Sequence, residues 1–302
     1  MSNIFVKLQE KGSIHPPEWL PCNMQYVTVV GSVLYGCDDA VIVKGRKPDK
    51  DIFGVVIPPK NMVFPHLGGH ILNFGTPPPG FQDWSKHHIS EKDCTYDLTV
   101  FGIVKFFELC RTNNPNMIDV LFVPENCILH CTNAGRIIRD NRKLFLSKLC
   151  WKKFRGYAMK QLKKMEKAAT GKRLDIIQKH GYDVKFAYHV VRLLDEAEQI
   201  LMETDLDLQR SKEVLKAIRR GEWTIEDIRK WVVEKDRVLE SVYSSSKLIE
   251  QPSEEVLLNV LLQCLEEHYG SLEKCITQSD WPIDGLKEID QILGKLRSRM
   301  YS

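Results

Sequence analysis

The texture of the chain changes near residue 134, and this change constrains the fold more than any single motif does. Before it, short apolar runs are separated by Gly, Pro and Asn, a pattern typical of strands joined by loops and short helices. After it, Gly and Pro become rare and apolar residues recur at helical spacing, as in GYDVKFAYHVVRLLDEAEQILM. We therefore predict an α+β fold, with a small mixed sheet in residues 1–133 and a helical region in residues 134–302.

Four short apolar runs, with a helix before the last of them, predict the sheet of the first part. A strand, a helix and a strand in this order indicate a small sheet with covering helices. Residues 58–95 are rich in Pro, Gly and aromatic side chains and are too long for a plain connection, so we predict an insertion or lid-like loop there. The predicted strands are Tyr26–Val30, Ile52–Ile57, Tyr96–Val100 and Met117–Val123, and the predicted helix is 100–112.

Composition excludes several classes of protein. Hydrophobic residues make up 43% of the chain and charged residues 27%, which is unlike a disordered or collagen-like protein. The net charge is only +3, so any attraction to nucleic acid has to come from local clusters of Lys and Arg.

The nine cysteines form no CxxC pair, as is typical of reduced thiols, and no apolar run has the length of a membrane span. The N-terminus lacks the apolar core of a signal peptide, so we expect a cytoplasmic protein without a membrane partner.

Asp49 and Asp51 lie two positions apart in PDKDIFGVV, at the start of a predicted strand. Side chains at this spacing point to the same face of a strand, so both carboxylates can reach hard cations such as Mg²⁺. Asp119 is flanked by apolar residues in another predicted strand, where an unpaired carboxylate would be costly. If these strands are neighbours, the three carboxylates form one metal site. Two alternatives stay open, a solvated turn for the Asp-x-Asp pair and an exposed strand face for Asp119.

Gly31 and Ser32 directly follow the apolar run that ends at Val30. A glycine lets the backbone approach a ligand closely, and the hydroxyl and N–H of Ser32 can donate to a phosphate oxygen. A tight turn without a ligand is the alternative. A Gly-Ser after a strand, two acids spaced by one residue on the next strand and an acid on a later strand together resemble the nucleotidyltransferase superfamily typified by DNA polymerase β.

Further segments narrow this resemblance and cover the chain from about residue 26 to residue 270. They are similar to a family of predicted RNA-repair nucleotidyltransferases found in bacteria and large phages. The resemblance implies that Asp49, Asp51 and Asp119 take the places of the metal-binding carboxylates, and that Gly31 and Ser32 take those of the phosphate-binding turn. The segments, in chain order, are GSVLYG, DKDIFGV, NNPNMIDVLF, FRGYAMKQLKKM, GYDVKFAYHVVRLL and YSSSKLIEQP.

Two basic features lie in the helical part. Lys185, His189 and Arg192 fall at positions i, i+4 and i+7, so they share one face of a predicted helix and could bind the phosphates of a nucleotide. The segment Lys148–Arg173 is crowded with Lys and Arg, interleaved with aromatic residues, as suits phosphate backbones and stacked bases. For both features an ordinary solvated helix face is the alternative.

These features together predict an enzyme that moves a nucleoside monophosphate from an NTP to a hydroxyl and releases pyrophosphate. We expect Mg²⁺ or Mn²⁺ as the cation, ATP as the NTP, and an RNA or tRNA 3′ end as the acceptor. A protein side chain is the alternative acceptor. Two rival functions also stay open, a nucleic-acid or partner-binding module that has lost transfer activity, and a metal-dependent nuclease or phosphohydrolase.

Overall fold

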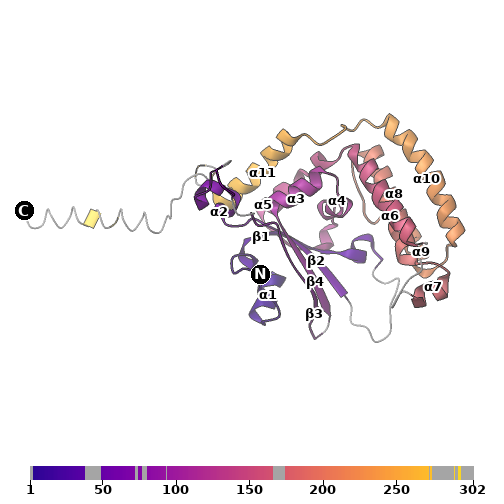
Figure 1. The fold of residues 1–302 in the computed structure, drawn as a ribbon, viewed down its shortest axis with the longest axis horizontal. Coiled ribbons are helices and arrows are strands. Elements are labelled where there is room, and N and C mark those ends of the chain that lie inside the picture. Colours follow the sequence, from indigo (N-terminus) through magenta and orange to yellow (C-terminus); the bar gives the residue numbers. More distant parts are fainter. Residues whose placement is uncertain are drawn as a thin grey trace, which may run out of the picture.

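A mixed five-stranded sheet lies at the centre of the first part of the chain (Figure 1). Its strands lie in the order β3-β4-β2-β1-β5. β2 and β4 are parallel, and the other neighbouring pairs are antiparallel. The strands are β1 (Met24–Val30), β2 (Asp49–Val56), β3 (Asp83–Ser90), β4 (Thr95–Gly102) and β5 (Ile128–Cys131). The computed structural model describes residues 3–37, 49–71, 74–76, 80–92, 94–165, 174–271, 273, 289, 292 and 293.

The two faces of the sheet bury separate sets of apolar side chains. Alternate residues of β2 divide between them, because successive side chains of a strand point to opposite faces. Ile52 packs in a smaller cluster with Phe5 of α1 (Ile4–Glu10), whereas Phe53 packs in the large cluster that extends into the helices. Three helices of the first part contribute to the large cluster: α3 (Ile103–Arg111), α4 (Pro115–Leu121) and α5 (Asn133–Asp140).

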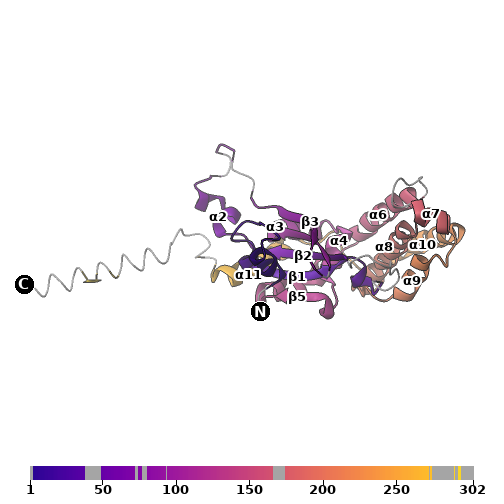
Figure 2. The ribbon, with the colours of Figure 1, turned by 90° about the horizontal axis from the view of Figure 1, so that it is seen from below.

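Helix α8 is the central element of the helical part, with α6, α9 and α10 packed against it. Figures 1 and 2 both show these helices on the side of the sheet away from α2 (Lys60–Val63). Asp183 caps the N-terminus of α8, and Ser253 caps that of α11, which packs on α5 and α3. The helices are α6 (Leu149–Met165), α7 (Leu174–His180), α8 (Val184–Glu203), α9 (Lys212–Arg220), α10 (Ile225–Ser245) and α11 (Glu254–Tyr269). The α+β fold with a helical C-terminal region is therefore confirmed.

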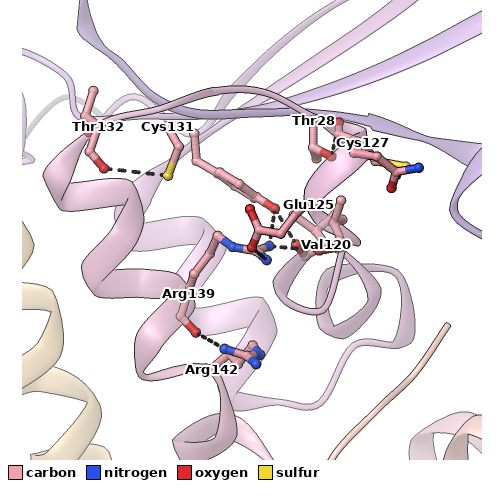
Figure 3. A network of polar contacts seen from close by, with 11 residues as sticks. Thr28, Val120, Glu125, Cys127, Cys131, Thr132, Arg139 and Arg142 are labelled. Atoms are coloured by element: carbon pink, nitrogen blue, oxygen red, sulfur yellow. Dashed lines mark hydrogen bonds and ion pairs between the residues drawn. The ribbon is translucent and has the colours of Figure 1, made fainter.

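Arg139 attaches α5 to the sheet (Figure 3). Its guanidinium donates to the hydroxyl of Tyr26 on β1 at 3.0 Å, to the carbonyl of Val123 at 3.0 Å and to Glu125 at 2.6 Å. Burial raises the pKa of Tyr26 to about 12, so this phenol stays protonated and accepts the bond from Arg139. The contact holds β1, whose end carries Gly31, against the helical layer.

The predicted strand Met117–Val123 is wrong, because residues 115–121 form helix α4. Asn114 caps this helix, and Pro115 occupies its first turn, where a missing N–H costs nothing. A short, fully buried helix has the same continuous apolar pattern as a buried strand, so the pattern alone could not distinguish them. The other three predicted strands are confirmed with shifted ends, since β2 begins before the predicted Ile52 and ends one residue before the predicted Ile57.

The predicted insertion at 58–95 contains a strand that the sequence did not reveal. β3 lies at the edge of the sheet and pairs antiparallel with β4. Its exposed, mostly polar residues lack the apolar alternation that indicates a half-buried strand. The same segment holds helix α2 (Lys60–Val63). The 3-10 turns in the described residues are Pro21–Asn23, Gly31–Tyr35, Pro65–Gly68, Glu125–Cys127 and Arg142–Phe145. Within the part of the chain with described positions, no helix has the length and apolarity needed to cross a membrane.

Candidate active site

Three aspartates lie on one face of the sheet, at the end where β2 and β4 begin. Asp49 and Asp51 are the first and third residues of β2, so they point to the same side. Asp97 is the third residue of the parallel strand β4 and is paired in register with Asp51. Paired residues of neighbouring strands point to the same face, so Asp97 joins the other two. This face is the one on which Phe53 contacts the helical core.

Burial and the neighbouring carboxylates raise the pKa of Asp51. Partial burial is the largest cause, and the negative charges of Asp97 and Asp49 add to it. Lys185 acts in the opposite direction, as does His87 to a smaller extent. The ionised carboxylate of Asp51 is therefore destabilised by its surroundings, and a bound cation would relieve that repulsion.

Gly31 is packed directly against Asp51. β1 ends at Val30, which pairs with Asp51, and the chain then turns into the 3-10 segment Gly31–Tyr35. Gly31 has φ of +79°, and a Cβ atom built on it would lie 2.5 Å from Oδ2 of Asp51. A side chain at this position would meet both the strained backbone conformation and the carboxylate. The partly exposed Ser32 follows, so the predicted Gly-Ser turn lies beside the carboxylates.

The predicted stripe on α8 extends from the carboxylate cluster into the core. Lys185, in the first turn, is exposed and close enough to Asp51 to lower its pKa. His189 is half-buried and packs edge-on against the ring of Tyr188 at 4.9 Å between centroids. Arg192 is only 5% exposed. The three side chains share one helix face, as predicted, but only Lys185 is placed to meet a solvated phosphate.

Asp119 belongs to a different and fully buried group of side chains. It is 2% exposed, and its Oδ2 accepts hydrogen bonds from Arg192 at 2.5 Å and from the hydroxyl of Tyr35 at 2.6 Å. Arg192 also donates to both oxygens of Glu196, at 2.9 and 3.0 Å, and to Tyr35 at 2.8 Å. Burial raises the pKa of Asp119, and the charge of Arg192 opposes that rise.

This group corrects the roles expected for Asp119 and Arg192. Asp119 was expected beside Asp51 because it was placed on a neighbouring strand. It lies instead on helix α4, so that expectation is wrong. Arg192 already binds two buried carboxylates, which leaves it unsuited to a triphosphate. The group instead joins α4 and α8 to Tyr35, at the end of the turn that begins with Gly31.

Asp97 is the residue that sequence reasoning missed. Its segment, TYDLTVFG, was recognised as a strand, but its pairing with β2 is a long-range contact that the local pattern does not encode. One signal was present, because Asp97 and Asp51 each directly precede the first buried residue of their strand.

The donor set suits a hard divalent cation. Three carboxylates supply only oxygen ligands, which Mg²⁺ and Mn²⁺ prefer, and their mutual repulsion favours a bound cation. Among the residues with described positions, no three His, Cys, Asp or Glu side chains are already gathered into a metal-binding group. The strand register brings Asp49, Asp51 and Asp97 to one face of the sheet.

The basic helix predicted at 148–173 is α6 in the residues that the structure describes. Two cations of the predicted segment are engaged, because Arg155 of α6 forms a forked pair with Asp236, and Lys148, directly before α6, pairs with Glu250. Trp151 and Phe154 are buried in the core, so they cannot stack on bases. Lys167, Lys172 and Arg173 lie outside the described residues. The exposed cations of this helix are Lys152, Lys153, Lys160, Lys163 and Lys164.

Comparison with known proteins assigns the chain to a family. The family model described as RlaP, RNA repair pathway DNA polymerase beta family, matches residues 8–251. A crystal structure of a nucleotidyltransferase-like protein from Exiguobacterium sibiricum 255-15 is similar with a TM-score of 0.28 and 9% sequence identity. That similarity covers 78% of this chain and 73% of the other. No curated protein matches the chain significantly.

Proposed function

Because this chain belongs to the RNA repair pathway DNA polymerase beta family and is therefore a nucleotidyltransferase, we propose that it adds a nucleoside monophosphate to an RNA 3′ end. The proposed donor is an NTP, with ATP the first candidate, and tRNA is included among the acceptors. The observation that carries this proposal is the placement of Asp49, Asp51 and Asp97 on one sheet face, beside the turn at Gly31.

The carboxylates and the turn have separate tasks in the proposed reaction. Asp49, Asp51 and Asp97 would hold Mg²⁺ or Mn²⁺, which when bound neutralises phosphate charge and favours ionisation of the attacking hydroxyl. The turn at Gly31 and Ser32 receives the β- and γ-phosphates, because its backbone lies next to the carboxylates without a side chain in between. Lys185 adds a positive charge on the helical side of the same space.

The transfer itself is a single displacement at the α-phosphorus of the NTP. The acceptor hydroxyl forms the new O–P bond as the bond from the α-phosphorus to the bridging oxygen breaks, and pyrophosphate leaves. The hydroxyl proton passes to a carboxylate of the cluster and from there to solvent. Arg192 and Asp119 stay outside the reaction and hold Tyr35, which closes the phosphate-binding turn.

An RNA acceptor is supported by the exposed face of α6. Five lysines of this helix are exposed, although two neighbouring cations are engaged by carboxylates. Such a row of ammonium groups binds phosphates without reading sequence. α6 packs directly on α8, the helix that carries Lys185, so RNA bound there would lie close to the active site.

Label transfer tests the proposal. The purified chain is incubated with Mg²⁺, each α-labelled NTP in turn, and either total RNA or total protein from a lysate. We expect label on RNA. Asp51→Asn and Asp97→Asn should each lower the rate by more than about a hundredfold, because each removes a charged ligand without changing its shape.

The matched control is Asp140→Asn, the same substitution at an exposed position on α5, which should leave the rate unchanged. Label on protein with none on RNA would replace the RNA acceptor by a protein side chain. Full activity of a folded Asp51→Asn, Asp97→Asn double variant would show that the carboxylates are not the catalytic ligands.

A further inference from the structure

Two histidines oppose Asp97 from the edge strand. The pairing of β3 with β4 shifts register between Lys86 and Ile89, so His87 and His88 together face the single residue Asp97. Such an extra residue is a β-bulge, a feature that often redirects side chains beside active sites. The histidines lie within the segment 58–95 that was predicted as an insertion, and the transfer mechanism does not use them.

The bulge fixes one oxygen of Asp97. The backbone N–H of His88 donates to Oδ1 of Asp97 at 2.6 Å, and the Nδ1 atoms of His87 and His88 lie 3.8 and 3.7 Å from the same oxygen. This contact occupies one oxygen and leaves Oδ2 for the cluster.

His88 adopts a backbone conformation that few non-glycine residues adopt. Its φ is +57°, in the left-handed region. In the described part of the chain, only Asn113 and Thr204 share this feature among non-glycine residues. Thr204 is the C-cap of α8, and Asn113 directly follows the C-cap of α3. A strained residue of this kind inside a sheet, bonded to a candidate catalytic carboxylate, indicates a functional constraint.

The order of elements across the sheet places the bulge on the acceptor side. The phosphate-binding turn follows β1, Asp51 lies on the next strand, Asp97 on the one after, and the bulge on the edge strand. In a displacement at phosphorus, the attacking and leaving oxygens are in line. With pyrophosphate leaving toward Gly31, the attacking hydroxyl comes from the side of Asp97 and β3.

We propose that the bulge at His87 and His88 binds the terminal nucleotide of the RNA acceptor and positions Asp97 for its hydroxyl. The imidazoles are 53% and 88% exposed, so their ring N–H groups are free to donate to the phosphate or ribose oxygens of an RNA end. The backbone N–H of His88 meanwhile holds Asp97 in place. This inference rests on the proposed function and adds to it the residues that bind the acceptor.

Steady-state kinetics with separate titration of the two substrates tests the imidazoles. We expect His87→Ala with His88→Gly to raise the KM for an RNA oligonucleotide roughly tenfold and to leave the KM for the NTP unchanged. The affinity of the metal-free protein for the same oligonucleotide, measured by fluorescence anisotropy, should fall by a similar factor. His15→Ala, an exposed histidine in the loop after α1, is the matched control and should change neither quantity.

A second pair of variants separates the backbone from the imidazole. His88→Gly keeps the N–H and accepts positive φ, so kcat should be retained, whereas the β-branched side chain of His88→Val resists that conformation and kcat should fall at least tenfold. Thermal melting establishes that each variant is folded.

Two results overturn the inference and are distinct from each other. Unchanged KM and affinity for RNA in the double histidine variant, in a chain that transfers label to RNA, overturn the histidine role alone. A wild-type chain that labels no RNA overturns the proposed function, and this inference with it.

Discussion

Gly31 and Asp51 can each be understood only through the other. Burial and neighbouring acids raise the pKa of Asp51. Gly31, which has no side chain, leaves the space that Oδ2 of Asp51 occupies. Both residues could be noticed in the sequence, because a Gly-Ser after a strand and an Asp-x-Asp at the next strand are local patterns. The sequence could not predict that they touch, since this depends on the register in which Val30 pairs with Asp51.

Gly31→Ala should abolish transfer, because the added methyl group would meet Oδ2 of Asp51 at 2.5 Å. We expect a loss of more than about a hundredfold in kcat/KM, measured by label transfer. Gly12→Ala is a matched control, since Gly12 has φ of +72° with no atom within 4 Å of a built Cβ. Both variants carry the backbone cost of about 1–2 kcal/mol, so only the contact with Asp51 distinguishes them. Equal activity of the two would mean that the turn at Gly31 is merely structural.

Asp51→Asn should stabilise the metal-free protein at neutral pH. A carboxyl whose pKa is raised by folding destabilises the folded state when it is ionised. This destabilisation is absent below the ordinary pKa of 3.8 and develops as pH rises through the interval up to the raised value. We therefore expect the melting temperature of Asp51→Asn to exceed that of the wild type by ~1–3 °C at pH 7 and to match it near pH 3.5.

Added Mg²⁺ gives an independent readout of the same residue. It should raise the melting temperature of the wild type and have little effect on Asp51→Asn, because binding to the folded state stabilises it. Asp140→Asn should respond to Mg²⁺ as the wild type does. A wild type that is indifferent to Mg²⁺ and Mn²⁺ would contradict the metal assignment.

At the scale of elements, helix α8 divides one stripe of side chains between two environments. The spacing of Lys185, His189 and Arg192 correctly predicted that they share a face, because helical periodicity is a local property. The burial of each side chain was not predictable, since it depends on contacts with other helices. Arg192, for example, is paired with Asp119, which α4 supplies. The same limit explains the missed Asp97, because its pairing with β2 is a long-range contact. The wrong strand at Met117–Val123 has a different cause, since a buried helix and a buried strand share one continuous apolar pattern.

Substitutions at the two ends of this stripe should separate stability from catalysis. Arg192→Leu leaves two buried carboxylates without their cation and should lower the free energy of unfolding by about 3–5 kcal/mol. Lys185→Leu, on the same helix but exposed, should change stability by less than about 0.5 kcal/mol and lower kcat/KM at least tenfold. Chemical denaturation and label transfer on both variants measure these effects. A stable and inactive Arg192→Leu variant would instead return Arg192 to the phosphate site.

At the scale of the whole molecule, one buried cluster joins the sheet to the helical part. Phe53 of β2 and Leu194 of α8 belong to it, so the two parts predicted from the change near residue 134 share a core. The proposed site lies across that boundary, with the carboxylates supplied by the sheet and Lys185 by α8. Since the net charge is only +3, long-range attraction to RNA is weak, and binding depends on where the cations are placed.

Charge reversal on α6 should therefore weaken RNA binding far more than the same reversal elsewhere. Lys160→Glu with Lys163→Glu removes two exposed cations from the face proposed for RNA. The slope of log affinity against log salt should flatten by about 0.7 for each lost phosphate contact on single-stranded RNA, and NTP binding should stay unchanged.

The matched control is Lys7→Glu with Lys92→Glu, which changes the net charge equally but at exposed positions on α1 and in the loop between β3 and β4. If RNA affinity responds only to total charge, the two double variants will behave alike, because both alter the same long-range field. If RNA affinity depends on phosphate contacts made by α6, only Lys160→Glu with Lys163→Glu will show both a lower affinity and a flatter slope of log affinity against log salt. Equal slopes in all three proteins would mean that α6 is a solvated surface and that the RNA end reaches the carboxylates by another path.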